Sequence, residues 1–461
     1  MSFHNASRRE FLKRSAALSM LGGAAPFALN LAGIGAAAAA TDPDYKALVC
    51  LFFFGGNDQT NTVIPYDTAS YNDYFAARDT IARLQADLLP LTTLSSLGGR
   101  QLALPKEFAP VKTLFDGGKA AILANVGPLI EPIANAAEYK SGKKRVPPKL
   151  FSHNDQVATW QAFTPEGAKL GWGGRFGDLL GSMNSNTVFT AISAAGNTVF
   201  LSGQNTFQYQ ISSGGAVGIN NINSTSLFGS PQGAAALKAV SIGNSAHLFE
   251  SEHGRVVKRS IDAQAAVSAA LTSLPTTDPK VALPTAQAQN RLAQQLQVVA
   301  RLAGVSASLG VKRQVFFVSI GGFDTHDNQL TQQPALHASI AGAVDYFYNA
   351  TVQLGIANNV TLFTGSDFGR TLTSNGDGSD HGWGSHHFIV GGAVKGQDVY
   401  GNFPVVKLGT AEDLGSGRLL PTTSVDQYAA TLGRWFGVAD SDLSTILPNI
   451  GRFDTRYLNF I

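Results

Sequence analysis

Four apolar segments, rich in β-branched and aromatic residues, run on without polar interruption and are followed at once by glycine. They lie at residues 46–58, 119–128, 313–326 and 359–371, and include the stretches KALVCLFFFGGND and RQVFFVSIGGFDTH. Continuous rather than alternating hydrophobicity is typical of strands buried on both faces, as in a parallel sheet covered by helices. The pattern therefore predicts strands of one buried sheet.

Between these segments, apolar residues recur at helical spacing. The spacing predicts helices over 107–118, 286–304 and 337–355, each closing on glycine, and a further helix that begins near Ser424 or Val425. The succession of helix, glycine, strand, glycine and polar loop predicts an α/β fold with a doubly wound, mainly parallel central sheet flanked by helices. We expect residues 41–461 to form a single domain of this kind.

The middle of the chain has a different composition. Residues 183–230 are rich in Asn, Ser, Gly and Gln and contain short alternating runs, as in NTVFLSGQNTFQYQISSGG. Such runs predict an inserted β-hairpin or a β cap region over the sheet.

The N-terminus reads as an export signal. Arg8 and Arg9 precede Phe11, Leu12 and Lys13, and a weakly hydrophobic Ala/Gly-rich stretch follows. This order is typical of a twin-arginine signal peptide over residues 1–40, which the twin-arginine export machinery reads on proteins that are already folded. We expect cleavage near residue 40, no stable membrane anchor afterwards, and a periplasmic or secreted protein. An uncleaved anchor is the alternative.

Charge and cysteine content narrow the function classes. The formal net charge is +2, and no Lys/Arg-rich patch is interleaved with aromatic residues, so nucleic-acid binding is not expected. The single cysteine, Cys50, lies within the apolar run ALVCLFFF and is expected to be a small buried hydrophobe.

Polar side chains follow each predicted strand. Parallel strands place their carboxyl ends at one edge of a sheet, where open α/β folds bind ligands, so we expect these groups to meet. Carboxylates and imidazoles without cysteine suit an open site for a divalent metal such as Zn, Mn, Mg or Ca. Each histidine taken alone could equally be a hydrogen-bonded surface residue. The groups are Asn57, Asp58, Asn125, Asp324, His326, Asp327, Ser366, Asp367 and Arg370, with Asp380, His381, His386 and His387 in a fifth cluster and Ser152, His153 and Asp155 in LFSHNDQ.

The same motifs carry a family resemblance. With the twin-arginine signal, the segments LFFFGGNDQTNTVIPYD, LFSHNDQVATWQ, GGFDTHDNQ, LFTGSDFGRT, DHGWGSHHFIVGGAVKG and LLPTTSVDQYAATL resemble the bacterial DUF1501 family of exported proteins over nearly the whole mature chain. That family is grouped by similarity with the alkaline phosphatase-like superfamily of phosphatases and sulfatases. The resemblance implies a metal site at the carboxyl edge of the sheet and chemistry on phosphate or sulfate esters.

Site residues follow from the resemblance position by position. It implies metal ligation by Asp58, Asp324, His326 and Asp367, with His381, or failing that His386, as the last ligand. Ser152 becomes the nucleophile. Phe368 departs from the pattern, because it stands where a second metal ligand is expected and its ring cannot bind a metal. The site then holds one metal, or His153 or a neighbouring loop residue substitutes, or the chemistry is lost.

Further roles come from the residue types themselves. His153 or His381 could act as acid or base, since imidazole titrates near neutral pH. Arg370 could clamp a phosphate or sulfate, or else cap a strand. Ser152 fits a helix N-cap as well as a nucleophile.

Two functions remain open on the sequence. The first is an exported metal-dependent hydrolase or transferase acting on phosphate or sulfate esters of a small molecule or glycan. The second is a non-catalytic periplasmic binding or assembly protein with a degenerate phosphatase-like metal site. A Ser-His-Asp esterase is disfavoured, because no G-x-S-x-G turn follows a strand.

Overall fold

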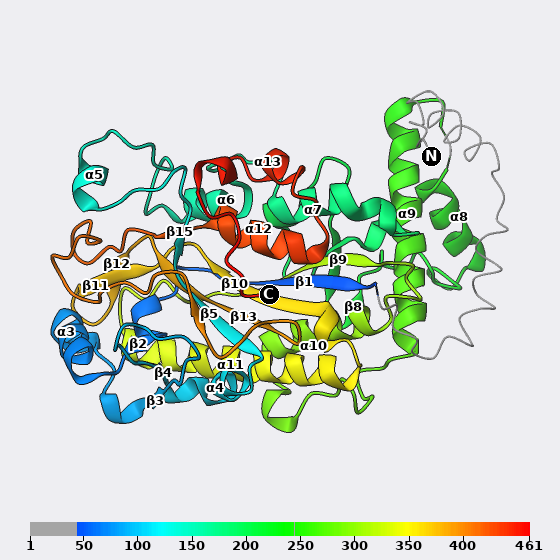
Figure 1. Cartoon of the computed structure of the whole chain (residues 1–461). Helices are drawn as coiled ribbons and strands as arrows, with labels where there is room; N and C mark the ends of the chain where they lie inside the picture. Colours follow the sequence, from blue (N-terminus) through cyan, green and yellow to red (C-terminus); the bar gives the residue numbers. More distant parts are fainter. Residues whose placement is uncertain (1–43, 244) are drawn as a thin grey trace, which may run out of the picture. The chain divides into compact units, whose positions relative to one another are not determined.

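The computed structural model, which describes residues 44–243 and 245–461, is built around one large mixed sheet (Figure 1). Within these residues nine strands follow the order β14-β5-β13-β10-β1-β9-β6-β7-β8, and a tenth, β15, pairs with β5. The strands are β1 (Lys46–Phe53), β5 (Ala120–Gly127), β6 (Ala191–Ser193), β7 (Tyr209–Ser212), β8 (Gly215–Ala216), β9 (Arg313–Ile320), β10 (Val360–Ser366), β13 (Ser385–Gly391), β14 (Val399–Tyr400) and β15 (Thr423–Ser424).

The four strands predicted from the apolar segments are β1, β5, β9 and β10, and all four run in the same direction. β1 pairs in parallel with both β9 and β10, with Cys50 opposite Phe317 on one side and Phe363 on the other. β13 is antiparallel to β10 and to β5, which leaves β5 parallel to β10. The prediction of a mainly parallel sheet is confirmed, with β13 as an antiparallel exception between two predicted strands.

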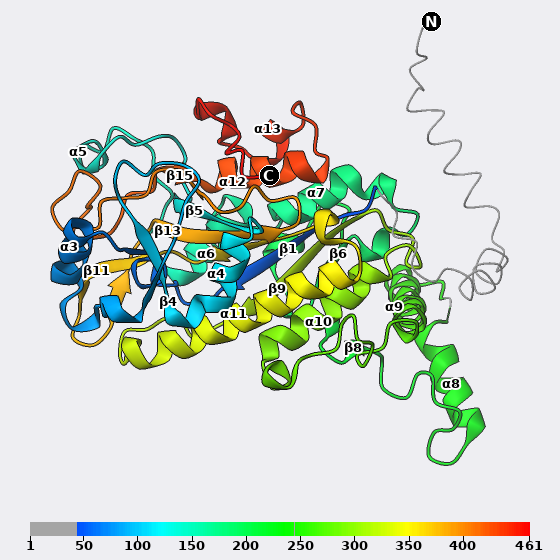
Figure 2. The same ribbon diagram turned by 60° about the horizontal axis from the view of Figure 1, so that its bottom comes forward.

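Both faces of the sheet are covered by helices, as the continuous hydrophobicity of the strands requires. Along β1, Leu48, Cys50 and Phe52 belong to one apolar cluster, whereas Val49 and Leu51 belong to another. Figures 1 and 2 show α6 (His153–Ala162), α7 (Trp172–Leu180) and α12 (Val425–Phe436) on one face and α4 (Ala109–Asp116), α10 (Arg291–Gly304) and α11 (Gln329–Gln353) on the other. The burial of Cys50 as a free thiol confirms its predicted role as a small hydrophobe.

The helices follow the predicted positions except at two N-termini, the first being that of α10, which begins at Arg291, five residues after the predicted start. α11 begins at Gln329, eight residues before the predicted start, and runs through Pro334. Proline lacks an N–H, which argues against a helix there on sequence grounds. Long-range bonds hold the first turns instead, since the side chains of Gln329 and Gln333 both donate to Asp58. The helices that match the prediction are α4 (Ala109–Asp116), α10 (Arg291–Gly304), α11 (Gln329–Gln353) and α12 (Val425–Phe436).

Other elements surround this core. Two small sheets pair β2 (Ile64–Pro65) and β3 (Leu88–Pro90) with β4 (Leu102–Pro105), and β11 (Arg370–Ser374) with β12 (Ser379–His381). The remaining helices are α3 (Thr68–Arg78), α5 (Ala136–Lys140), α6 (His153–Ala162), α7 (Trp172–Leu180), α8 (Pro231–Ser241), α9 (Leu248–Thr272) and α13 (Leu443–Ile446).

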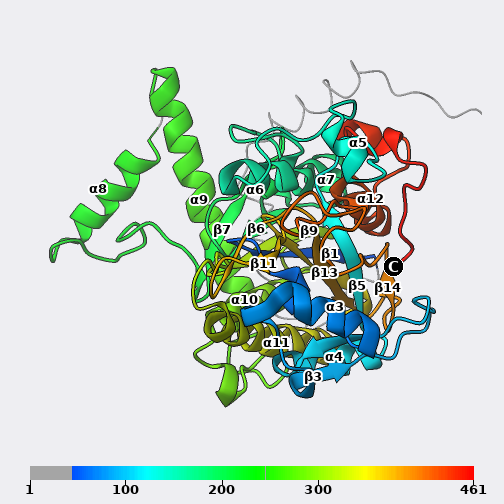
Figure 3. The same cartoon turned by 90° about the vertical axis from the view of Figure 1, so that its left-hand side faces the viewer.

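Residues 183–230 contribute to the sheet itself. β6 pairs in parallel with β9, β7 pairs in parallel with β6, and β7 and β8 form an antiparallel hairpin. The segment therefore extends the sheet at the β9 edge before the chain enters α8 and α9 (Figure 3). A role for it as a cap over the site stays a prediction.

The N-terminal signal predicted over residues 1–40 lies outside the described residues. Among those that the structure describes, no helix is both apolar enough and long enough to cross a membrane.

Candidate metal centre

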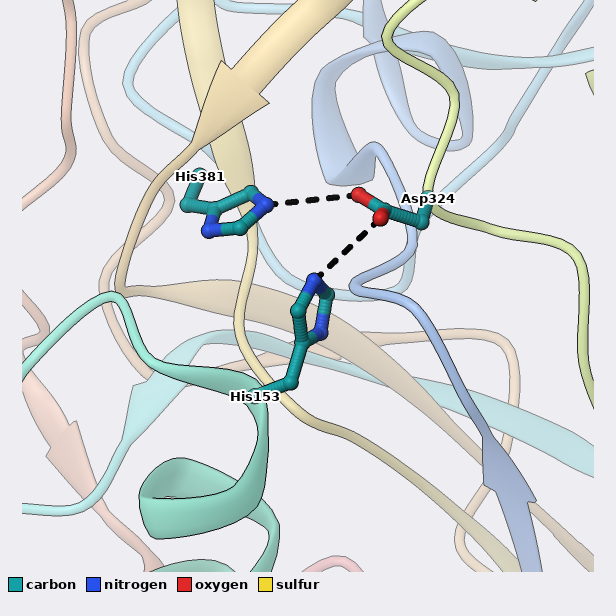
Figure 4. A group of neighbouring side chains, drawn as sticks. All are labelled: His153, Asp324 and His381. Carbon is teal, nitrogen blue, oxygen red and sulfur yellow. Dashed lines mark hydrogen bonds and ion pairs between the residues drawn. The ribbon is translucent and has the colours of Figure 1, made fainter.

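Loops from three parts of the chain bring imidazole and carboxylate groups to the carboxyl edge of the parallel strands. Asp324 follows β9, His381 ends β12, and His153 opens α6. Figure 4 shows the two imidazoles pointing toward the Asp324 carboxylate. The approach depends on Gly55 at the end of β1, where φ is +112° and a Cβ would lie 2.3 Å from the backbone nitrogen of Asp324.

The Asp324 carboxylate lies at the centre of the cluster. His153 Nε2 is 3.4 Å from its Oδ2, and His381 Nε2 is 3.3 Å from its Oδ1. His326 Nε2 lies 3.0 Å from the same Oδ1 and 2.9 Å from His381 Nε2. One ligand atom each from His153, Asp324 and His381 falls within 4.8 Å of the others, a spacing that could hold a metal ion.

The far nitrogens of the imidazoles have oxygen partners that fix the rings. His153 Nδ1 is 2.7 Å from Oδ2 of Asp367, and His381 Nδ1 is 2.8 Å from the carbonyl oxygen of Phe151. An oxygen acceptor at Nδ1 favours the tautomer that carries its proton there and leaves the Nε2 lone pair free. Histidines that bind metals commonly donate their other N–H to a carboxylate or a carbonyl in this way.

His326 shows the same orientation at a more exposed position. Its Nδ1 lies 3.3 Å from Oδ1 of Asp380, whose other neighbour is the Asn375 side chain, and its Nε2 faces Asp324. Three imidazoles therefore direct Nε2 toward one carboxylate, with an oxygen beside each Nδ1.

Unpartnered buried atoms support the fit to a cation. Within the described residues, Asp367 Oδ1 is buried without a hydrogen-bond partner, and His153 Nε2 is buried with only Oδ2 of Asp324 facing it, at 3.4 Å. A buried carboxylate oxygen without a partner calls for an explanation, and a bound ion is one. Imidazole nitrogens with a carboxylate oxygen suit Zn or Mn, and the carboxylates alone would suit Mg or Ca. The residues present thus fit a divalent metal.

The electrostatics of the cluster favour an ionised carboxylate at its centre. Partial burial acts to raise the pKa of Asp324, but the hydrogen bond and charge of Arg370 outweigh it, so the pKa lies below its ordinary value. The hydrogen bond with Asp367 raises the pKa of His153. Burial lowers the pKa of His381. The Asp324 side chain is 46% exposed, which leaves the site open to solvent.

Two residues implied as ligands by the resemblance lie elsewhere. Asp58 forms a buried ion pair with Arg78 and accepts bonds from the amides of Thr60 and Asn61, so its carboxylate caps a short helical turn. His386 is buried with its Nδ1 accepting from the backbone N–H of Asn125 at 3.0 Å. Neither belongs to the cluster around Asp324, because the side chains are already committed to local partners.

Arg370 has different partners from those expected of a substrate clamp. Its side chain is fully buried, and it donates to Oδ1 of Asp324 at 3.0 Å and to the carbonyl oxygen of Gly55 at 2.9 Å. Further bonds reach Ser379 and the carbonyl of Phe323. With its N–H groups bound to the protein, Arg370 holds Asp324 and ties the ends of β1 and β9 to β12.

Ser152 lies at the N-cap position of α6, directly before His153. Its hydroxyl donates to Oδ2 of Asp155 at 2.9 Å and makes no bond to a helix amide. The cap position predicted from the sequence is therefore present, but the hydroxyl is oriented by a carboxylate. This arrangement leaves its role as a nucleophile open.

Phe368 packs behind the imidazoles. Its ring centroid is 4.8 Å from that of His153 and 4.6 Å from that of His381, and the residue is 1% exposed. The ring also fills the space above Gly56, whose Cβ would lie 2.4 Å from it. Phe368 therefore supports two of the candidate ligands instead of supplying one.

Some members of the site were not identified from the sequence. His153 was expected as an acid or base, and as a ligand only by substitution, yet it is one of the three residues that converge. The carbonyl of Phe151, which orients His381, was assigned no role, and the Asp380 carboxylate, which orients His326, was named only among the groups expected near the metal. Asp380 stands beside His381 in the sequence, which is a usable signal, whereas a backbone carbonyl leaves none.

Comparisons with solved structures give weak likenesses. Ps i-CgsB is 12% identical with a TM-score of 0.34, and its complex with k-i-k-neocarrahexaose is 10% identical with a TM-score of 0.33. Both matches cover 89% of this chain and 77% of that chain. A structure from work on the metabolism of multiple glycosaminoglycans by Bacteroides thetaiotaomicron is 11% identical, with a TM-score of 0.34 over 86% and 73% of the two chains. At these TM-scores the likeness supports no statement about activity.

Sequence comparison is more specific. No curated protein matches the chain. The profile of the DUF1501 family, described as a protein of unknown function, matches residues 45–448 and so spans the described strands and the whole cluster. The chain belongs to the DUF1501 family.

Proposed function

We propose that this chain is an exported, metal-dependent hydrolase or transferase acting on phosphate or sulfate esters. The observation that supports the proposal best is the convergence of His153, His381 and Asp324 at the carboxyl edge of the parallel strands. Open α/β sheets bind ligands at this edge. The resemblance to the phosphatase and sulfatase superfamily points to the same class of chemistry.

In this proposal the metal ligands are His153, Asp324 and His381, with His326 as a fourth donor from the same side. Asp367 orients His153, and Arg370 keeps the Asp324 carboxylate ionised and in place. A divalent ion held there supplies positive charge beside the ester oxygens and lowers the pKa of a water or hydroxyl nearby.

The group transfer is assigned to Ser152. Its hydroxyl oxygen forms a bond to phosphorus or sulfur while the bond to the ester oxygen breaks, and the hydroxyl proton passes to the Asp155 carboxylate that it already contacts. The released alcohol takes its proton from water, which reaches the exposed side of Asp324. The hydroxide left by that water then cleaves the ester on Ser152, or deprotonates a second alcohol that accepts the group, and the Ser152 oxygen recovers its proton from Asp155.

Metal content is the first test. The purified protein is expected to hold a divalent ion by elemental analysis, and Asp324→Asn or His381→Gln is expected to remove most of it. Asp327→Asn is the matched control, because it makes the same charge change three residues beyond Asp324. A protein without metal whose stability is unchanged by EDTA contradicts the proposal.

Activity is tested with chromogenic phosphate and sulfate esters. Ser152→Ala is expected to abolish turnover while leaving the metal content unchanged, because Ser152 is not a ligand in this proposal. Turnover that persists in Ser152→Ala assigns the attack to water and removes Ser152 from the mechanism.

A second candidate function is a periplasmic binding or assembly protein in which the metal is structural. Phe368 favours it, because an aromatic ring stands where the resemblance implies a second ligand. Asp58 favours it too, because its carboxylate forms an ion pair with Arg78 and is not directed at a metal. Stoichiometric metal without turnover of any ester tested would select this function over catalysis.

Export by the twin-arginine machinery is part of the proposal. Replacing Arg8 and Arg9 by lysine in the full-length chain is expected to retain the protein in the cytoplasm, measured by cell fractionation. Unchanged export of that variant would contradict this route.

A further inference from the structure

A strongly basic segment leads into the candidate metal centre. Residues 140–149 read KSGKKRVPPK, so half of the side chains are basic and none is acidic, whereas the net charge of the whole chain is only +2. This basic loop starts at the last residue of α5 and is followed closely by Ser152 and His153. Figures 1 and 2 show α5 at the same end of the sheet as β11, the strand that pairs with β12 and its His381.

The basic loop is fixed by its apolar side chains, and its basic side chains face solvent. Val146 packs against a small apolar cluster that includes Trp383, as do Leu150 and Phe151 beyond the loop. Lys140 and Lys143 are exposed, and the side chains of Arg145 and Lys149 are 63% and 66% exposed. A surface held in place before binding loses little conformational entropy when a ligand arrives.

Acidic neighbours compensate only part of this charge. Lys144 and Arg145 lie 3.8 Å and 3.6 Å from glutamates, and pairs that are this exposed are weak and easily exchanged. In the described part of the chain, Lys140 and Lys143 have no acidic partner. The loop therefore presents positive charge that the protein itself does not neutralise.

Basic side chains continue from the loop to the edge of the metal centre. Lys149 Nζ lies 3.4 Å from Oδ1 of Asp155, the proposed acceptor of the nucleophile's proton. On the other side, Arg418 donates to the carbonyl oxygen of His381 at 3.0 Å, and its guanidinium lies 5.3 Å from the centre of the Phe151 ring. A polyanion held on the loop is thus led toward the residues that could bind a metal.

The rest of the surface indicates which kind of polyanion fits. Between residues 129 and 151, all of which the structure describes, no large apolar side chain is exposed, although binding at a lipid surface relies on buried apolar groups. The rings of Tyr139 and Phe151 pack against the apolar cluster, whereas single-stranded nucleic acids stack their bases on exposed rings. An anionic polysaccharide needs neither feature, because its charged groups stand along a hydrated chain and pair with lysine and arginine individually.

We propose that the basic loop and Arg418 form a docking surface for a linear polysaccharide that carries several anionic groups. The docking itself does not depend on the proposed catalytic function. That the docked chain presents one of its ester groups to the metal centre does rest on that function.

The test is binding of fluorescent dextran sulfate to the purified protein, followed by anisotropy at low ionic strength. Dextran sulfate is expected to bind, and uncharged dextran of the same length is not. The variant Lys140→Gln/Lys143→Gln/Arg145→Gln is expected to weaken binding by about tenfold, because each exposed ion pair contributes a few-fold at most. Circular dichroism checks that the variant is folded, as is expected when only exposed side chains change.

The matched control is Lys238→Gln/Arg255→Gln/Lys258→Gln on α8 and α9, which removes the same charges elsewhere. Arg255 and Lys258 are 68% and 62% exposed, and Arg255 pairs with a glutamate as Arg145 does. Its affinity for dextran sulfate is expected to stay within about twofold of wild type. Equal losses in the two triple variants overturn the proposal, as does a wild-type protein that does not bind dextran sulfate.

Two further arms separate this proposal from its alternatives. Dextran sulfate is expected to bind equally well in EDTA, so a protein without metal or turnover contradicts the proposed function and leaves the docking surface standing. Binding that EDTA abolishes places the polymer at the metal and overturns the docking surface. Duplex DNA or anionic phospholipid vesicles that bind more tightly than dextran sulfate, and lose affinity in the loop variant, overturn the assignment to a polysaccharide.

Discussion

One carboxylate organises the candidate metal centre. Oδ1 of Asp324 faces Arg370, His326 and His381, while Oδ2 faces His153. Oxygen acceptors beside the Nδ1 atoms turn the imidazoles so that their Nε2 atoms meet at this carboxylate. Metal binding at this site is therefore expected to depend on the oxygens beside the Nδ1 atoms as well as on the candidate ligands. Without such an oxygen an imidazole can rotate, and its Nε2 no longer points at Asp324.

The partner of His153 provides a direct test at the residue scale. Asp367→Asn removes the charge that fixes the His153 ring and is expected to weaken metal binding by about 10- to 100-fold, measured by competition with a chelator. Asp155→Asn at the same end of α6 is the control, because Asp155 contacts Ser152 and Lys149 and none of the imidazoles. Equal losses in the two variants would contradict the positioning role of Asp367.

A second residue-scale prediction concerns pH. Burial raises the pKa of Asp426 to about 7, although the backbone N–H of Asn449 donates to it. Its folded pKa thus exceeds the unfolded value of about 3.9. The contribution of Asp426 to the free energy of unfolding is therefore complete below pH 4 and is lost as the pH rises toward 7. Asp426→Asn is expected to raise the free energy of unfolding at pH 8 by roughly 2–4 kcal/mol, with no difference below pH 4. A lower urea midpoint for the variant at pH 8 would refute the assignment.

At the scale of elements, the site depends on how closely the β1 and β9 loops approach. Gly55 has φ +112° and its missing Cβ leaves room for the backbone of Asp324. Its backbone N–H also donates to Asp367 at 3.1 Å, so the same residue fixes the loops after β9 and β10. A side chain at this position would push the ends of β1 and β9 apart and would move Asp324 away from the imidazoles.

Gly55→Ala is therefore expected to destabilise the protein by about 3 kcal/mol or more and to lower its metal content. Gly118→Ala separates backbone strain from steric overlap, because Gly118 has φ +69° with nothing within 4 Å of its Cβ position. That control is expected to cost about 1 kcal/mol, the penalty of a left-handed conformation alone. Urea unfolding measures both, and equal losses would exclude the overlap as the cause.

For the whole molecule, buried neutral histidines set the response to acid. His337, His386 and His387 are at most 1% exposed, and burial lowers the pKa of each to about 3. Their folded pKa values lie below the unfolded value of about 6.5. The contribution of these three histidines to the free energy of unfolding is therefore complete above pH 6.5 and is lost as the pH falls toward 3. Between these pH values the three imidazoles are protonated in the unfolded chain but stay neutral in the folded core.

Each histidine is expected to contribute a slope of about 1.4 kcal/mol per pH unit, and Asp426 opposes one of the three between pH 4 and 7. From urea titrations at pH 4 and 6, the free energy of unfolding is thus expected to fall by about 3 kcal/mol for each pH unit that the pH is lowered. His387→Gln should reduce this slope, whereas His247→Gln, at an exposed position before α9, should leave it unchanged. The same slope in both variants would show that other groups dominate.

Much of the fold could be predicted from the sequence. β1, β5, β9 and β10 were found because strands buried on both faces need an uninterrupted apolar run. α12 was found from its apolar positions at helical spacing, and the structure adds that Ser424 and Gln427 cap it with a reciprocal pair of bonds. The start of α11 could not be found in this way, since bonds from Gln329 and Gln333 to Asp58 override Pro334. The antiparallel course of β13 was equally hidden, because an apolar run does not record its direction.

The sequence by itself determined which strands are buried and which loops carry carboxylates and imidazoles, because hydrophobic periodicity and residue type are local properties. Only the tertiary structure decided which of those groups share a point in space. Asp58 and Asp324 both follow a buried strand, yet Arg78 neutralises the first, whereas Arg370 steadies the second beside three imidazoles. The difference lies in the distances between residues that are far apart in the chain. Tertiary packing determines these distances, and the local sequence pattern does not record them.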